Sequence, residues 1–187
     1  MPTKKNKKIY TLNDYKNGDG MLTAVWGPSL WHYLHIMSFN YPVEPTNQDK
    51  INYRQFILNL QNVLPCKYCR INLKNNFKAH PLKMCHMKNR DSFSRYIFKL
   101  HEIINKMLNK NSNLKYCDVR ERYEHFRARC TDENPKIFNF KKTRKKEKGC
   151  TEPLYGKKSK CIIKIVPQET KCETMQIDKK CIKKRLT

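Results

Sequence analysis

Apolar side chains recur at helical spacing through the middle of this chain, between residues 26 and 130. Spacings of three and four residues place side chains on one face of an α-helix, so the pattern predicts helices throughout this range. The first helix should begin with Pro28 in its opening turn and end before Pro42, since proline fits a first turn but cannot continue a helix. A second helix should follow Thr46, which forms a capping box with Asp49.

Three further helices are predicted downstream. Pro65 ends the second helix, and a short third helix should run from there to about Phe77. A polar loop over residues 80–89 precedes a long fourth helix that Asp91 can cap. The fifth should run over residues 117–130. The pattern therefore predicts an all-α fold for this part of the chain.

The two ends of the chain differ from this helical part. Residues 1–20 are basic and polar and contain two glycines, which indicates a flexible lead-in. Near the other end, a basic run over residues 141–148 comes before a strand-like segment at 161–166. We therefore predict three regions: a lead-in at 1–20, a helical domain at 21–130, and a basic cysteine-containing extension at 131–187.

The chain carries 40 Lys and Arg residues against 16 Asp and Glu, a formal net charge of +24 over 187 residues. The excess is not confined to the extension, because residues 1–130 carry 23 basic and 9 acidic side chains. Weak attraction to a polyanion and an ordinary lysine-rich solvated surface both fit this charge. No stretch approaches the roughly 20 apolar residues of a membrane span, and no secretion signal is expected.

Cys66 and Cys69 are separated by two residues, a spacing that suits either metal binding or cycling between dithiol and disulfide. Zinc needs two more ligands at close spacing, and Cys85 and Cys117 each stand alone, so no metal is predicted. The start of a helix, with Lys67 nearby, favours a thiolate. The pair is therefore predicted to be redox-active.

Two pairs of side chains have the character of a cofactor pocket. Trp31 and His35 are four residues apart and share a helix face, and so do His101 and Asn105. An indole, two imidazoles and an amide can hold a flat heteroaromatic ring by stacking and hydrogen bonding. No glycine-rich phosphate loop is present, so a dinucleotide would bind in a helical pocket.

These motifs together resemble the ERV/ALR family of FAD-linked sulfhydryl oxidases. In that family W-x-x-L-H, Y-P, C-x-x-C and H-N-x-V-N follow one another in this order, and the matching segments here are 26–35, 41–42, 65–69 and 93–105. The resemblance covers roughly residues 24–130. It is greatest to members from large DNA viruses.

The resemblance implies a four-helix bundle that binds FAD, with a short fifth helix and usually as a homodimer. Such enzymes pass two electrons from client thiols through FAD to oxygen. Cys69 matches the thiol that faces the flavin, and Cys66 matches the one that exchanges with the client. If the source is viral, the protein is expected in the host cytoplasm or the virion. The positions that match cofactor contacts are Trp31, His35, Tyr41, His101, Asn105, Lys110 and Tyr123.

Three positions depart from the family pattern. Pro28 stands where cellular members commonly have an arginine that helps to hold the cofactor, and Glu102 replaces the first asparagine of H-N-x-V-N. Phe98 replaces a cysteine that many members bridge to the position near Cys117. The Cys117 thiol could therefore pair with Cys85 or remain free.

The extension leaves several alternatives open. Its cysteines could relay electrons from client thiols, staple a small appendage, or bind zinc. For the whole chain, the alternatives to an oxidase are a thioredoxin-like oxidoreductase, a basic nucleic-acid-binding protein and a redox-inactive scaffold. No βαβ pattern surrounds the cysteine pair, which disfavours the first of these. The cysteines in question are Cys150, Cys161, Cys172 and Cys181.

Overall fold

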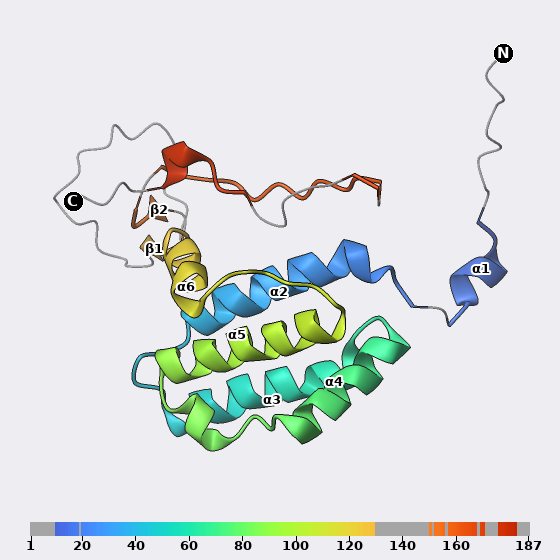
Figure 1. Ribbon diagram of the computed structural model, residues 1–187, viewed down its shortest axis with the longest axis horizontal. Helices are drawn as coiled ribbons and strands as arrows, with labels where there is room; N and C mark the ends of the chain where they lie inside the picture. Colours follow the sequence, from blue (N-terminus) through green and yellow to red (C-terminus); the bar gives the residue numbers. More distant parts are fainter. Residues whose placement is uncertain are drawn as a thin grey trace, which may run out of the picture.

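Four α-helices form the body of the structure: α2 (Thr23–Phe39), α3 (Asn47–Val63), α4 (Lys67–Ala79) and α5 (Arg90–Met107). Helix α2 lies along α5, and α4 lies along α3 (Figure 1). The computed structural model describes residues 10–18, 20–129, 150, 152–155, 157–167, 169–170 and 176–182. The predicted all-α fold and four-helix bundle are confirmed.

Shorter elements flank the bundle. Helix α6 packs across α2, as the fifth helix that was predicted. A two-residue strand that follows α6 pairs antiparallel with a second such strand from the extension. The bounds of these elements are α1 (Leu12–Lys16), η1 (Met84–Met87), α6 (Tyr116–Glu124), β1 (Ala128–Arg129), β2 (Glu152–Pro153) and η2 (Lys179–Cys181).

The apolar residues of the bundle form one large cluster and one small one. The small cluster joins the end of α2 to α6 and consists of Phe39, Val119 and Tyr123. Burial of such side chains stabilises the fold by removing apolar surface from water, and here it also fixes α6 against α2. The large cluster contains Leu34, Tyr41, Ile57, Leu64, Leu73, Phe77, Leu82, Met87, Phe93, Tyr96, Ile97 and Leu100.

The start of α3 follows the prediction. The Thr46 hydroxyl accepts the backbone N–H of Asp49 at 3.1 Å, and the Asp49 carboxylate accepts the backbone N–H of Thr46 at 2.9 Å. The start of α5 was predicted wrongly by two residues. Asn89 is the N-cap, with its Oδ1 accepting the N–H of Ser92, while Asp91 lies in the first turn.

The start of α2 was also predicted wrongly. The helix begins at Thr23, so Pro28 lies inside it rather than in its first turn. The turn before Pro28 is stabilised because the Leu22 carbonyl accepts hydrogen bonds from the N–H groups of both Val25 and Trp26, at 3.0 and 3.4 Å. Proline lacks the N–H that would bond the carbonyl four residues earlier, and the helix continues through this gap to Phe39.

Three other expectations need correction. Helix α6 ends at Glu124 rather than Cys130, because the Arg127 side chain turns back to bond the Glu124 carboxylate and the Phe39 carbonyl. Residues 161–165 are exposed, Val166 is half-buried, and this described segment forms no strand. The lead-in contains a short helix, α1, which Thr11 caps.

Other sequence predictions lie outside the described residues. These concern the basic run at 141–148, Cys130 and Cys172. The three-region division also stays a prediction, although α2 to α6 fall within the domain predicted at 21–130. None of the described helices combines the length and the apolar character that a membrane crossing requires.

Candidate functional site

The two closely spaced cysteines lie at the start of α4. Cys66 is the N-cap residue, and its Sγ accepts the backbone N–H of Cys69 at 3.2 Å. Both are free thiols and both are partly buried. A sulfur in this position receives backbone N–H groups and the positive end of the helix dipole, which favours its thiolate form.

The two thiols have opposite shifts in pKa. The pKa of Cys66 is lowered, chiefly by its hydrogen bond with the Cys69 thiol, with smaller contributions from backbone N–H groups and from Arg70. Burial, followed by the interaction with Cys66, raises the pKa of Cys69 to about 11. Cys66 is therefore the thiol that ionises first, while Cys69 keeps its proton.

Helices α2 and α5 bring three rings together. The Trp31 indole stacks on the His101 imidazole, with ring centroids 3.9 Å apart and planes inclined by 5°. His35 Nε2 and His101 Nδ1 are hydrogen-bonded at 3.0 Å. These residues were predicted to share one pocket, and the structure places them in contact.

Both of these imidazoles are neutral at physiological pH. Burial, with a smaller contribution from the neighbouring His101, lowers the pKa of His35 to about 3. Burial also lowers the pKa of His101 to about 4. A neutral imidazole has one N–H donor and one acceptor nitrogen, so this pair can donate and accept hydrogen bonds without a charge.

Helix α6 completes the ring cluster. The Tyr123 ring stacks on His35, with centroids 5.1 Å apart, and its hydroxyl is hydrogen-bonded to His32 Nδ1 at 3.2 Å. His32 was not identified from the sequence. Its position three residues before His35 puts both rings near one face of α2, and this spacing could have indicated it.

One buried nitrogen of the cluster has no hydrogen-bond partner. His35 Nδ1 is buried and unpaired, and an unpaired buried polar atom costs free energy unless a ligand or water satisfies it. Stacked aromatic rings together with this unsatisfied nitrogen fit a flat heteroaromatic group that carries hydrogen-bonding atoms.

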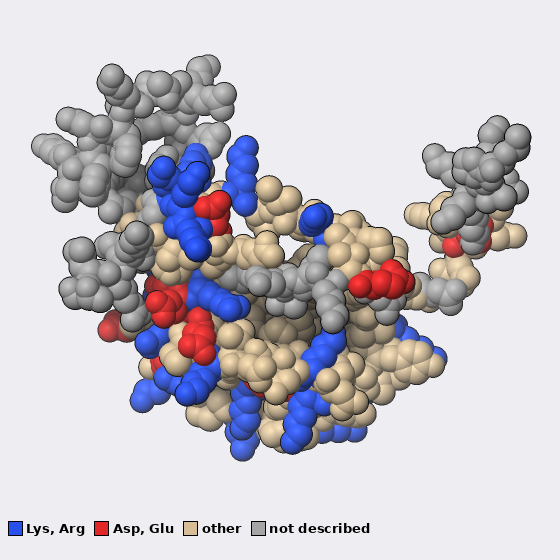
Figure 2. Space-filling model, turned by 45° about the horizontal axis from the view of Figure 1, so that its top comes forward, with Lys and Arg blue, Asp and Glu red and all other residues tan. Residues whose placement is uncertain are grey.

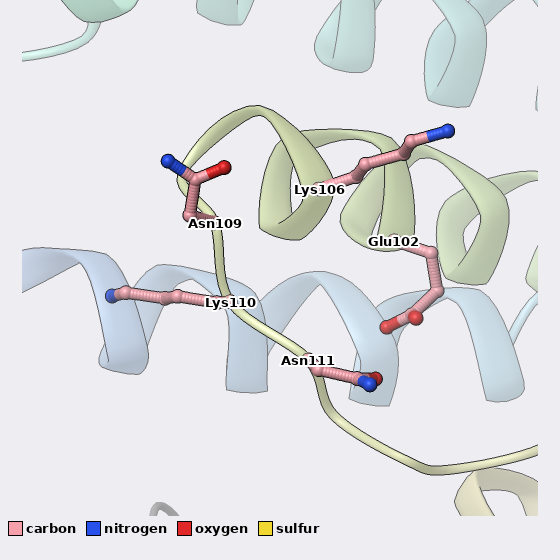
Figure 3. A pocket seen from close by; sticks show the side chains of 5 residues that line it. All are labelled: Glu102, Lys106, Asn109, Lys110 and Asn111. Atoms are coloured by element: carbon pink, nitrogen blue, oxygen red, sulfur yellow. The ribbon is translucent and has the colours of Figure 1, made fainter.

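A hollow of about 530 Å³ lies beside the end of α5, lined by Glu102, Lys106, Asn109, Lys110 and Asn111. Figure 3 shows the Glu102 carboxylate pointing toward the segment that carries Asn111. Glu102 accepts a hydrogen bond from Asn105 Nδ2 at 3.0 Å and thereby orients that amide. Two lysines beside these polar groups suit an anionic ligand such as a phosphate.

Tyr41 lies apart from the other predicted cofactor residues. Its side chain is fully buried, its hydroxyl donates to the Met87 carbonyl at 2.9 Å, and its ring packs against Tyr53 and Phe93. These contacts account for Tyr41 as a core residue. Its contact with a cofactor stays a prediction.

The thiol pair and the ring cluster share one apolar core. Cys69 and Trp31 both pack against the large apolar cluster, which lies between the helices that carry them. The two sites that the sequence indicated separately therefore border the same core of the bundle.

The remaining described cysteines do not form a second close pair. Cys85 and Cys117 are exposed free thiols, so they are not bridged to one another. In the extension, Cys150 is disulfide-bonded, while Cys161 and Cys181 are free. Among the described residues, no group of three or more His, Cys, Asp or Glu side chains is arranged to hold a metal ion.

Comparisons with known proteins match this region of the chain. The model of the Erv1 / Alr family matches residues 28–127. A probable FAD-linked sulfhydryl oxidase of Acanthamoeba polyphaga mimivirus is 31% identical over 80 residues, which cover 43% of this chain and 56% of that protein. An FAD-linked sulfhydryl oxidase of African swine fever virus is 30% identical over 99 residues, covering 53% of this chain and 80% of the viral protein.

The fold is also similar to a solved structure. The crystal structure of the yeast Erv1 core superposes with a TM-score of 0.50 at 22% identity, covering 66% of this chain and 94% of that one. At this identity the similarity concerns the fold. The chain spans little more than half the length of the mimivirus relative.

We expect the stability of the protein to fall as the pH is lowered from about 6.5 toward 4. His35 and His101 stay neutral in the folded protein at these pH values, because their pKa values are about 3 and 4, whereas the unfolded chain takes up protons at its ordinary histidine pKa of 6.5. Each buried histidine can contribute up to about 1.4 kcal/mol of lost stability per pH unit. Urea unfolding between pH 4.5 and 7.5 measures this slope.

Two variants provide the comparison. His101→Gln should flatten the pH dependence, whereas the same change at the exposed His80 should leave it as in the wild type. Equal slopes in all three proteins would show that the buried imidazoles do not cause the effect.

Proposed function

The chain belongs to the Erv1 / Alr family, and on this premise we propose that it is an FAD-linked sulfhydryl oxidase that makes disulfide bonds in thiol-containing client proteins. The observation that carries the proposal is the location of the Cys66–Cys69 dithiol in the same helical bundle as the Trp31, His35 and His101 cluster. A redox pair and a pocket for a flat ring are the two parts that such an oxidase needs.

The overall reaction balances without a further reactant. Two client thiols lose two electrons and two protons and form a disulfide. Dioxygen takes up these electrons and protons and becomes hydrogen peroxide. Bound FAD would accept the electron pair from the protein dithiol and pass it to dioxygen. Dioxygen as the acceptor is part of the proposal.

The two cysteines have different roles. With the pair oxidised, a client thiolate attacks Cys66 Sγ and releases Cys69 as the leaving thiolate. A second client thiolate then attacks the mixed disulfide, and Cys66 leaves with the electron pair. Thiols of low pKa leave faster, so the lowered pKa of Cys66 supports its place as the client-facing thiol. Cys69 packs against the same apolar core as Trp31, which suits the flavin-facing role.

The residues present fit the expected cofactor. The indole of Trp31 and the neutral imidazoles of His35 and His101 would hold a flat ring system, with the unpaired His35 Nδ1 available as a hydrogen-bonding atom. Asn105 and Lys110 would contact the polar part of the cofactor. Lys110 would neutralise a phosphate charge, a contact that Pro28 cannot make where cellular members of the family commonly have an arginine. Tyr123 would support the site through its stacking on His35.

The positive charge has a weaker role in this proposal. On the face shown in Figure 2, Lys and Arg side chains are spread over several areas rather than collected in one patch, and acidic side chains are fewer. This distribution supports salt-sensitive attraction to acidic clients or other polyanions. This face carries no single basic patch of the kind that a nucleic-acid-binding protein commonly has.

We place the protein in the host cytoplasm or the virion of a large DNA virus, on the support of its viral relatives. A homodimer is also part of the proposal. On one side of α2 and α3 the aromatic rings of Tyr33 and Phe56 meet edge to face at 6.1 Å while remaining 52% and 39% exposed, and Ile36 is 39% exposed beside them. Contiguous exposed apolar side chains of this kind mark association surfaces.

Replacing the flavin-facing thiol tests the oxidase assignment. Cys69→Ser should retain bound FAD but lose oxygen consumption with dithiothreitol, by at least about 100-fold, because the electron pair cannot leave the dithiol. Flavin absorbance and an oxygen electrode provide the two measurements. Cys85→Ser, which alters an exposed free thiol, is the matched control and should match the wild type. Peroxide production at the wild-type rate by Cys69→Ser would refute the assignment.

Changing the exposed aromatic face tests the homodimer. Tyr33→Lys should weaken dimerisation by at least about tenfold, because it places a charge in an apolar contact. The same change at Tyr15, an exposed tyrosine on α1, should have no effect. Analytical ultracentrifugation measures both. A wild-type protein that sediments as a 22.5 kDa monomer at all concentrations would rule out the dimer.

A further inference from the structure

A short segment before α2 is bonded directly to the residue that precedes Cys66. The backbone N–H of Met21 donates to the Pro65 carbonyl at 2.8 Å. The carbonyl of the same residue accepts a hydrogen bond from Trp26 Nε1 at 3.1 Å. Met21 therefore links the first turns of α2 to the loop that carries the client-facing thiol.

The preceding residue lies even closer to this loop. A Cβ atom at Gly20 would meet the Pro65 carbonyl oxygen at 2.8 Å and the Cys66 Cα at 3.1 Å. Both neighbours are backbone atoms, so they cannot rotate away as a flexible side chain would. Only glycine fits this approach without moving one of the two segments. Gly18, two residues earlier, has no atom within 4 Å of its own Cβ position.

The other hydrogen bonds of the loop come from the helices that it connects. The Leu64 N–H donates back into α3, the Arg70 guanidinium donates to the Leu64 carbonyl, and the Arg70 N–H donates to the Cys66 carbonyl at 3.1 Å. Pro65 has no N–H. Among the hydrogen bonds of the described residues, the one from Met21 is therefore the one that reaches residues 64–66 from a different part of the chain.

From this geometry we propose that Gly20 and Met21 form a strap that positions Cys66 for thiol exchange. The strap holds the Pro65–Cys66 peptide plane, and this plane sets where Cys66 Sγ stands relative to the N–H of Cys69. It also ties the redox loop to α2, the helix that carries Trp31 and His35. Gly20 and Met21 are positioning residues that act through Cys66. The inference rests on the proposed function for its use of Cys66.

A substitution at Gly20 should therefore change the chemistry of Cys66. In Gly20→Ala the added methyl group pushes the strap and the loop apart, the Met21 hydrogen bond lengthens or breaks, and Cys66 Sγ loses its fixed place at the helix start. The thiolate is then less stabilised. We expect alkylation of Cys66 at pH 7 to slow by about three- to tenfold, with its pH profile moved to higher pH.

The measurement uses fully reduced full-length protein under nitrogen. Iodoacetamide labelling of Cys66 is followed by peptide mass spectrometry across the pH range, and the equilibrium of the Cys66–Cys69 disulfide with glutathione is measured alongside. Gly18→Ala is the matched control and should behave as the wild type in both measurements. A role confined to overall stability would lower the melting temperature without moving the pH profile of Cys66.

A second variant keeps the inference testable if Gly20→Ala fails to fold. Trp26→Phe keeps the aromatic ring but removes the N–H that holds the Met21 carbonyl, and it should move the alkylation profile in the same direction by a smaller amount. A wild-type profile and glutathione equilibrium in a folded Gly20→Ala, or in Trp26→Phe if only that variant folds, would overturn the strap. Neither measurement involves flavin or oxygen, so the strap and the oxidase assignment can fail separately.

Discussion

The packing of α2 against α5 is the constraint on which the candidate site depends. It brings Trp31 and His35 from one helix onto His101 of the other and removes all three rings from most of the surrounding water. Burial disfavours the charged imidazolium form, so both histidines stay neutral. Tyr123 of α6 covers the same cluster from a third direction. A cluster built this way is aromatic and uncharged, and the charged groups nearest to His101 are Glu102 and Lys110.

The properties of the thiol pair depend on the start of one helix rather than on the packing of two. Its reactivity comes from the start of α4, where backbone N–H groups and a neighbouring thiol stabilise negative charge on Cys66, while burial keeps Cys69 protonated. The surroundings alone thus give the two neighbouring thiols different pKa values. In the proposed reaction, this difference supports electron flow from the client at Cys66 to the core at Cys69.

Much of this arrangement could be predicted from sequence because it depends on local signals. The capping box at Thr46 and the helical spacing of His101 and Asn105 involve residues within one turn, and the structure agrees with them. The errors concern the ends of helices. Helix α6 ends early because Arg127 turns back to the distant Phe39, whereas α2 extends beyond Pro28 to Thr23 with local hydrogen bonds to the Leu22 carbonyl. Tyr41 packs in the core, and its contact with a cofactor stays a prediction. The closeness of Gly20 to Cys66 depends on tertiary packing and has no local signal.

A bundle with these residues should hold a flavin that a working dithiol reduces. The most direct test is the visible absorption spectrum of the purified full-length protein, combined with quantification of released flavin. We expect about one FAD per chain, with flavin bands that bleach when dithiothreitol is added under nitrogen and return when air is admitted. A colourless protein that acquires no flavin bands when incubated with FAD would contradict it.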